Sequence, residues 1–189
     1  MTKYNLSAPV PDLRGPAKGR RVALVTAQTP GDASWRHGHS PFATNVEFVA
    51  AVRAARPDVY LVFKEHPDLV AGLRPGATPR AAVAAFADLV LTEGDAAGLY
   101  AQCDEVHVMT SLSGFEALLR GCAVTCWGLP FYAGWGLTED RTPCPRRTRR
   151  LSVDELAVAA LALYPRYMDP GSGVPCRVED VLAMVAADA

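Results

Sequence analysis

Short runs of apolar, largely β-branched residues recur along this chain, and polar loops or helical patterns separate them. A run of this length and composition is typical of a strand that is buried on both faces. Strands that alternate with helices build a parallel sheet covered by helices on both sides. The sequence therefore predicts an α/β fold, a Rossmann-like parallel sheet with helices on both faces. The expected strands are residues 21–26, 59–63, 89–91, 105–109 and 123–127.

Helical spacing of apolar residues fills the intervals between these runs and the end of the chain. The predicted helices are residues 45–56, 79–87, 96–102, 113–120, 152–163 and 178–187. Ser152 with Glu155 forms a capping-box pattern at the start of the fifth helix. Residues 1–20 are rich in proline and glycine, which predicts an extended leader, and residues 21–189 are predicted to form a single lobe.

Composition and charge exclude several classes of protein. The 189 residues carry a net charge of −1, which gives no case for nucleic acid as a partner. No apolar stretch approaches the ~18 to 20 residues of a membrane span, and the N-terminus lacks the apolar core of a secretory signal. The five cysteines are scattered, so thiols in a reducing cytoplasm explain them better than disulfides or a metal site. We predict a cytoplasmic protein with no bound metal.

The carboxyl ends of the predicted strands carry most of the polar residues in the loops. In a parallel α/β sheet, ligands bind beyond these ends, where the loops gather. The candidate binding residues near the ends of the first, second and fourth strands are Gln28, Asp32, Lys64, His66, Pro67, Thr110, Ser111, Ser113, Gly114 and Glu116. Three further candidates follow the fifth strand, namely Tyr132, Gly134 and Trp135. Their convergence on one rim is a stronger signal than any single motif.

The segment 110–121, TSLSGFEALLRG, joins the fourth strand to a helix through a turn of hydroxyl side chains and a glycine. Backbone N–H groups, the helix dipole and two serine hydroxyls favour an anion at such a turn, and phosphate is the usual guest. The alternative is that Ser111 or Ser113 simply caps the helix. Taken alone, the turn favours the capping alternative; the polar rim as a whole favours a ligand site.

Five segments carry a resemblance that covers most of the chain after about Arg21. They are 63–68 (FKEHPD), 110–121 (TSLSGFEALLRG), 128–138 (GLPFYAGWGLT), 144–151 (CPRRTRRL) and 163–167 (LYPRY). Together and in this order they resemble the bacterial capsule polysaccharide biosynthesis family, and within it the β-Kdo transferases. Those enzymes transfer 3-deoxy-manno-octulosonic acid (Kdo) from CMP-Kdo to a lipid-borne acceptor.

The resemblance implies a GT-B-like arrangement of two Rossmann-type lobes, of which the C-terminal lobe binds the CMP-sugar. This chain matches only that lobe. We therefore expect the donor-binding lobe of a retaining β-Kdo glycosyltransferase in capsular polysaccharide or lipid-linker synthesis, inactive without a partner lobe. The missing N-terminal lobe would bring the lipid-linked saccharide acceptor and the catalytic carboxylate, so no catalytic residue is assigned. CMP-Kdo is the donor substrate, no cofactor is expected, and the implied location is the inner face of the cytoplasmic membrane.

The resemblance also implies roles for residues near the expected phosphate. His66 and Ser111 are expected to act on the same phosphate from adjacent strand ends, with Pro67 fixing the turn that aims the imidazole. Lys64 is expected to pair with the phosphate or the sugar carboxylate. Glu116 either accepts from the ribose hydroxyls or is an ordinary acid in the first turn of its helix.

Two further features have a functional and a structural interpretation. Tyr132 and Trp135 either contact the cytosine or the sugar, or anchor the loop after the fifth strand. The basic run 146–150 either meets an anionic acceptor or a membrane surface, or is a solvated face that pairs with Glu139 and Asp140. A different class of function is also open, a non-catalytic nucleotide-binding or interaction module that stands alone as a degenerate lobe. A UDP-linked donor is a third alternative, and the His66-Pro67 element favours CMP over it.

Overall fold

The computed structural model describes residues 9–187, which belong to two compact units. The first unit is Met1–Arg150 and the second is Leu151–Ala189. The residue pattern had predicted a single lobe over residues 21–189, and it carries no signal for a boundary after Arg150.

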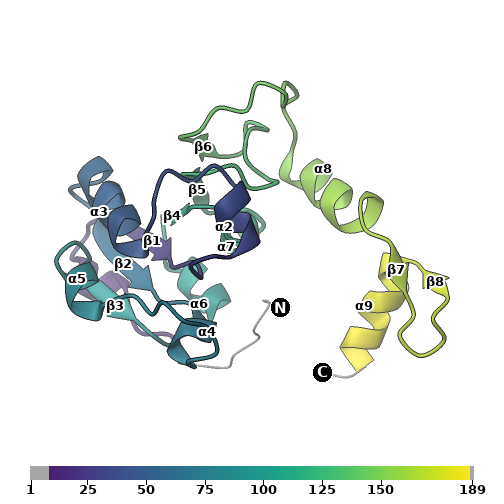
Figure 1. Cartoon of the computed structure of the whole chain (residues 1–189), viewed down its shortest axis with the longest axis horizontal. Helices are drawn as coiled ribbons and strands as arrows, with labels where there is room; N and C mark the ends of the chain where they lie inside the picture. The colour runs from purple at the N-terminus through teal and green to yellow at the C-terminus, as the bar shows by residue number, and fades with distance from the viewer. Residues whose placement is uncertain (1–8, 188–189) are drawn as a thin grey trace. The chain divides into compact units, whose positions relative to one another are not determined.

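A six-stranded sheet forms the centre of the first unit, and its strands all run parallel in the order β3-β2-β1-β4-β5-β6 (Figure 1). This is the strand order of a Rossmann fold, so the predicted α/β architecture is confirmed. The strands are β1 Val22–Thr26, β2 Tyr60–Lys64, β3 Leu89–Leu91, β4 Glu105–Val108, β5 Ala123–Cys126 and β6 Glu139–Asp140. The first five are the predicted strands with small shifts at their ends. The sixth was missed because two acidic residues at a sheet edge carry no hydrophobic pattern.

Helices cover both faces of this sheet. They are α1 Arg14–Ala17, α2 Ala33–His37, α3 Asn45–Ala55, α4 Pro67–Val70, α5 Arg80–Ala84, α6 Ala96–Tyr100 and α7 Ser113–Leu118. On one face, apolar residues of β1 and β2 form a buried cluster with Phe48, Val49 and Val52 of α3 and Val83 of α5. Because side chains alternate along a strand, the intervening residues face the other side, where α7 packs against β4 and β5.

The predicted leader differs from expectation in its described part, residues 9–20. Residues 14–17 form the short helix α1, and Leu13 and Ala17 are fully buried. The backbone N–H of Leu13 donates to Oε1 of Gln102 (2.8 Å), and the Arg14 guanidinium makes two hydrogen bonds to Asp104. Leu13 and Ala17 lie four residues apart, so one helix face can bury both. The remainder, residues 1–8, lies outside the described residues.

The second unit is a small assembly of helices and one hairpin. The capping box at Ser152 and Glu155 is confirmed, and it opens α8 Val153–Val158, which continues as the π-helical turn η1 Ala159–Leu163. A short antiparallel pair follows, β7 Tyr167–Met168 with β8 Pro175–Cys176, and α9 Val178–Ala187 is the last described helix. Among residues 9–187, no helix combines the length and the apolar character that a membrane crossing needs.

Candidate functional site

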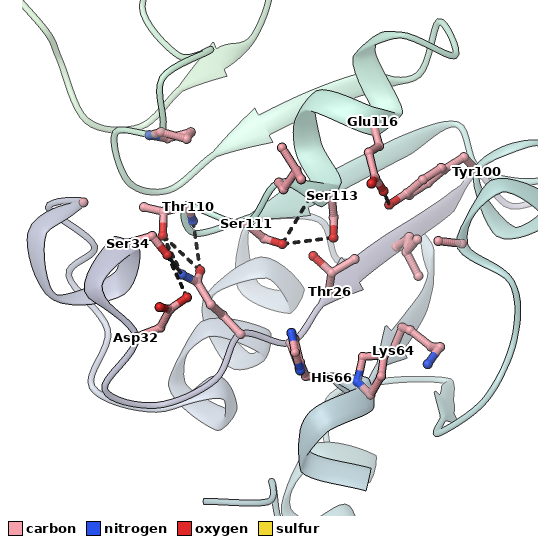
Figure 2. Close-up of a pocket in the computed structure, with 18 of the residues that line it drawn as sticks. Thr26, Asp32, Ser34, Lys64, His66, Tyr100, Thr110, Ser111, Ser113 and Glu116 are labelled. Carbon is pink, nitrogen blue, oxygen red and sulfur yellow. Dashed lines mark hydrogen bonds between the residues drawn. The ribbon is translucent and has the colours of Figure 1, made fainter. Parts of the chain in front are cut away.

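A cavity of about 560 Å³ opens at the carboxyl ends of β1, β2 and β4, within the first unit (Figure 2). Its volume is in the range of small-molecule sites. It lies beside β1 and β4, where the strand order reverses and the following loops diverge. The predicted residues that line it are Gln28, Asp32, Lys64, His66, Pro67, Thr110, Ser111, Ser113, Glu116 and Tyr132. Gly114, Gly134 and Trp135 are not among the lining residues.

The turn between β4 and α7 presents two serine hydroxyls to the cavity. The Ser111 hydroxyl donates to Oγ of Ser113 (3.0 Å) and accepts from the Ser113 backbone N–H (3.2 Å). No side chain caps α7 from the assigned N-cap residue, Leu112, whose own backbone is already helical. Ser111 caps the start of the helix through the bond from the Ser113 N–H, so the capping alternative accounts for Ser111, and both serines also line the cavity.

His66 begins α4 on the opposite side of the cavity. Its Nδ1 accepts a hydrogen bond from the Asp68 backbone N–H (3.2 Å), and Pro67 occupies the first helical position. A neutral imidazole whose Nδ1 accepts carries its proton on Nε2, where it is a donor. The buried carboxylate of Glu65 accepts from the backbone N–H groups of His66 (2.9 Å) and Thr78 (3.1 Å). His66 is thus held at two points, its imidazole Nδ1 and its backbone N–H.

The prediction that His66 and Ser111 lie at adjacent strand ends is wrong. Strand β1 separates β2 from β4 in the sheet, and Thr26, at the end of β1, lies between the two groups (Figure 2). The order of strands in space, which the sequence pattern does not report, accounts for the error. Oγ1 of Thr26 is buried and has no hydrogen-bond partner among the described residues. A ligand that reached both His66 and Ser111 would lie over Thr26.

Gln28 braces the cavity wall from within the protein. Its amide nitrogen donates to Oγ1 of Thr110 (2.7 Å) and to Oγ of Ser34 (2.8 Å), and its Oε1 accepts from the Thr110 backbone N–H (3.2 Å). The Ser34 hydroxyl in turn donates to Oδ2 of Asp32 (3.0 Å). Gln28 is buried, so its hydrogen bonds join the ends of β1 and β4, and Asp32 terminates the network at the cavity.

Two ionisable groups on the lining have protein partners. Nζ of Lys64 donates to the backbone carbonyls of Glu65 (3.2 Å) and Thr92 (2.9 Å), and burial lowers its pKa. Glu116, in the first turn of α7, accepts from the Tyr100 hydroxyl (3.3 Å). Burial raises the pKa of Tyr100, so this hydroxyl keeps its proton at neutral pH and orients the carboxylate.

The residues expected after β5 divide between the cavity and the surrounding loop. Tyr132 is fully buried and its hydroxyl donates to the backbone carbonyl of Ser111. The Trp135 indole donates to the Phe131 carbonyl (2.8 Å) and stacks under Arg147, and Gly134 has φ +79° and donates its N–H to Asp140. Tyr132 and Trp135 are therefore held as loop anchors in this structure.

The basic run is partly structural. Nη1 of Arg147 donates to the carbonyls of Pro130 (2.7 Å) and Ala133 (2.6 Å). Glu139, an expected partner of the run, instead pairs with Arg56 and Arg141 (2.6 Å each).

Several lining residues were missed by the sequence analysis. They include Thr26, Ser34, His37, Glu65, Asp95, Tyr100, Leu112, Pro130 and Phe131. Among them, Leu112 and Phe131 are apolar yet 45% and 44% exposed. Phe131 adjoins Tyr132 in the segment 128–138, which the resemblance had already singled out, and both of these aromatic residues line the cavity.

The chain matches one family model and is similar to proteins of known name. The family model described as capsule polysaccharide biosynthesis protein matches residues 12–167. The capsule polysaccharide modification protein LipA of Neisseria meningitidis serogroup A is 43% identical over 170 residues, 90% of this chain and 24% of LipA. The lipopolysaccharide-processing protein LpsZ of Rhizobium meliloti is 39% identical over 188 residues, 100% of this chain and 43% of LpsZ.

Two solved structures of KpsC from Thermosulfurimonas dismutans superpose on the chain. The first, a beta Kdo 2,7 transferase, has a TM-score of 0.79 and 37% identity, and the match covers 97% of this chain and 56% of that one. The second, a beta Kdo 2,4 transferase, has a TM-score of 0.77 and 34% identity over 98% and 57% of the two chains. The chain thus spans little more than half of these structures, and less than half of the curated relatives.

Proposed function

The chain belongs to the capsule polysaccharide biosynthesis protein family, and from that premise we propose that it is the donor-binding lobe of a Kdo glycosyltransferase that uses CMP-Kdo. The solved relatives are Kdo transferases by their descriptions, which supports the sugar. The Rossmann-type lobe with its cavity at the switch point supports a nucleotide-linked donor. The His66-Pro67 element favours CMP among the nucleotides.

The main support for the proposal is that His66 and the serine turn lie on opposite sides of one cavity. The imidazole is fixed by its Nδ1 acceptor bond, and the hydroxyls of Ser111 and Ser113 lie on the far side of Thr26. Three neutral donors that converge on a cavity suit a phosphodiester, which offers several acceptor oxygens and a single charge. The backbone groups and side chains that fix them are already in place without a ligand.

The chemistry of the transfer explains why donors belong there. When the bond between the anomeric carbon of Kdo and the phosphate oxygen breaks, the electron pair stays on that oxygen and CMP leaves with an additional negative charge. Hydrogen bonds aimed at this oxygen stabilise the transition state more than the ground state. In the proposed complex, Nε2–H of His66 and the two serine hydroxyls supply these bonds, and the Ser111 hydroxyl turns from Oγ of Ser113 toward the phosphate. The nucleophile that attacks the anomeric carbon is not assigned to a residue of this chain.

Other lining residues take the remaining parts of the donor. We assign the cytosine or sugar ring to the exposed apolar surface of Leu112 and Phe131, in place of Tyr132 and Trp135. Glu116 accepts from the ribose hydroxyls, and Lys64 faces the Kdo carboxylate. The lipid-linked saccharide acceptor and the retaining chemistry belong to a partner lobe in a GT-B-like pair at the cytoplasmic face of the inner membrane.

Titration calorimetry with CMP tests the proposal on the isolated chain. The informative substitution at the histidine is His66→Asn, because asparagine is a good N-cap and preserves the hydrogen bond from Asp68 N–H while it removes the Nε2 donor. Loss of one well-placed hydrogen bond to a phosphate costs about 1.5 to 3 kcal/mol, roughly ten- to a hundred-fold in affinity. Ser111→Ala should lower affinity over a similar range, and Ser172→Ala, in the second unit, is its matched control.

Binding and stability together separate the outcomes. If His66 and Ser111 share one phosphate, the double variant should be non-additive. Equal or absent binding of CMP, UMP and UDP by the unmodified chain contradicts the CMP assignment. Intact CMP affinity with a lowered melting temperature in the variants contradicts the site and leaves a structural role for both residues. Transfer of Kdo by the isolated chain would show that the nucleophile lies within it.

A further inference from the structure

The carbonyl of Ser111 is held by a buried tyrosine from a different loop. The hydroxyl of Tyr132 donates to this carbonyl, which also accepts the Gly114 N–H (3.2 Å) in the turn. Ser111 is the residue whose side chain, together with Ser113, faces the cavity. The serine turn is therefore fixed through its backbone carbonyl, by a tyrosine that is itself part of the cavity wall.

Tyr132 is itself immobilised on three sides. Its ring stacks against Phe115 at a centroid distance of 6.2 Å and meets Phe131 edge-on at 5.1 Å. Gly114 of α7 lies so close that a Cβ there would be 2.4 Å from Oη of Tyr132. The absence of a side chain at Gly114 is what admits the tyrosine hydroxyl to the carbonyl of Ser111.

Arg147 fixes the backbone on both sides of Tyr132. One guanidinium nitrogen donates to the carbonyls of Pro130 and Ala133, which flank the tyrosine in sequence. Gly134 makes room for it, because a Cβ at Gly134 would lie 3.1 Å from Cδ of Arg147. The hydrogen bonds thus form a continuous connection, which we call the Arg147–Tyr132 brace, from the segment after β6 to the serine turn after β4.

We propose that Tyr132, supported by Arg147, is a positioning residue that sets the affinity of the serine turn for the phosphate group of a nucleoside monophosphate or its sugar ester. The inference rests on the proposed function, since it concerns the same cavity. A preorganised set of donors binds a ligand more tightly, because the conformational entropy of the donor groups is lost on folding and not on binding. Loss of the brace should therefore weaken contacts to phosphate and spare contacts to the nucleoside.

The test compares CMP with cytidine, which lacks the phosphate. Tyr132→Phe keeps the ring and removes only the hydrogen bond, and we expect CMP affinity to fall about five- to twenty-fold with cytidine affinity unchanged. Arg147→Met, which keeps an unbranched apolar stem, should act in the same direction, and it serves if Tyr132→Phe does not fold. The matched controls are Tyr164→Phe, at an 88% exposed tyrosine, and Arg146→Met, at an exposed arginine next to Arg147.

Amide hydrogen exchange supplies a readout that needs no ligand. In Tyr132→Phe the peptide that carries residues 110–114 should exchange faster, and peptides from β1 and β2 should be unchanged. An equal loss of CMP and cytidine affinity, or unchanged CMP affinity together with unchanged exchange, would overturn the positioning role. If the unmodified chain binds CMP no better than cytidine, the proposed phosphate site fails, and the exchange of residues 110–114 still decides whether Tyr132 orders the turn.

Discussion

Replacing Gly114 by alanine sets two physical effects against each other. Gly114 is the second residue of α7 and does not have the positive φ that would require glycine. Helix propensity alone predicts that alanine stabilises such a position by about 0.5 to 1 kcal/mol. The new Cβ would, however, meet Tyr132 at 2.4 Å from Oη and at 2.8 and 2.9 Å from two ring carbons.

The steric effect should prevail because Tyr132 has no space to move into. It is fully buried, it is hydrogen-bonded to Ser111, and Phe115 and Phe131 pack against its ring. Overpacking of a well-packed core costs about 1 to 3 kcal/mol. After the propensity gain of about 0.5 to 1 kcal/mol is subtracted, Gly114→Ala should lower the free energy of unfolding by up to about 2.5 kcal/mol, and at about 2 to 4 °C per kcal/mol for a chain of this size the melting temperature should fall by up to about 10 °C.

Scanning calorimetry of a double-mutant cycle tests this reasoning. Tyr132→Phe removes the nearest contact and leaves the two ring carbons, so Gly114→Ala should cost less in that background. Gly121→Ala is the control, because Gly121 has φ +77° with nothing within 4 Å, and its cost comes from backbone strain alone and should not depend on Tyr132. A raised melting temperature in Gly114→Ala, or an equal cost in both backgrounds, refutes the steric account.

Three further predictions concern the packing of the first unit. Leu13→Ala should lower the free energy of unfolding by about 2 to 5 kcal/mol in urea titrations, since Leu13 is fully buried; a change below 1 kcal/mol would mean that residues 9–20 do not belong to the core. The hydrogen bond from Arg14 holds the pKa of Asp104 below its usual range, so its contribution exists above the ordinary Asp pKa of about 4 and disappears as the pH falls through the lower folded value. Asp104→Asn should thus lower the free energy of unfolding by roughly 1 to 2 kcal/mol at pH 7, and in acid the variant and the unmodified chain should be equally stable. A difference in stability that does not depend on pH would contradict the assignment. Burial raises the pKa values of Cys103 and Cys126 to about 12, which leaves both thiols protonated at pH 8; peptide mass spectrometry should find them alkylated far more slowly in the native chain than in urea, and equal rates would contradict their burial.

The sequence predicted the sheet well because five of its strands are buried runs whose pattern is local. It failed at Glu139–Asp140, where pairing with β5 and not composition makes a strand. It failed also at Leu13, since proline and glycine nearby indicate a turn but do not exclude a buried contact. In each case the structure depends on a partner distant in sequence.

The candidate site likewise combines features that a local sequence pattern reveals with features that depend on distant partners. His66 and the two serines could be predicted because strand ends are visible in the sequence and their polar residues stand out there. The tautomer of His66 depends on the turn of α4 that it caps, which is too short for a sequence pattern. Tyr132 lies between an apolar segment and a glycine, and both its interpretations fitted that pattern. The anchoring role is visible only in the bond to the carbonyl of Ser111, which the fold brings beside it.

The strand order also determines when, during folding, the cavity can exist. β1, α2, α3 and β2 are consecutive and can assemble with His66 in place, whereas the serine turn reaches the cavity only after β4 has paired with β1. Gln28 and Thr110, which join these ends, are 82 positions apart, and contacts of such separation carry the larger loop-closure cost and slow folding. A refolding chain should therefore acquire native-like secondary structure around His66 before it acquires any capacity to bind a nucleotide, and the return of binding would mark the completion of the sheet.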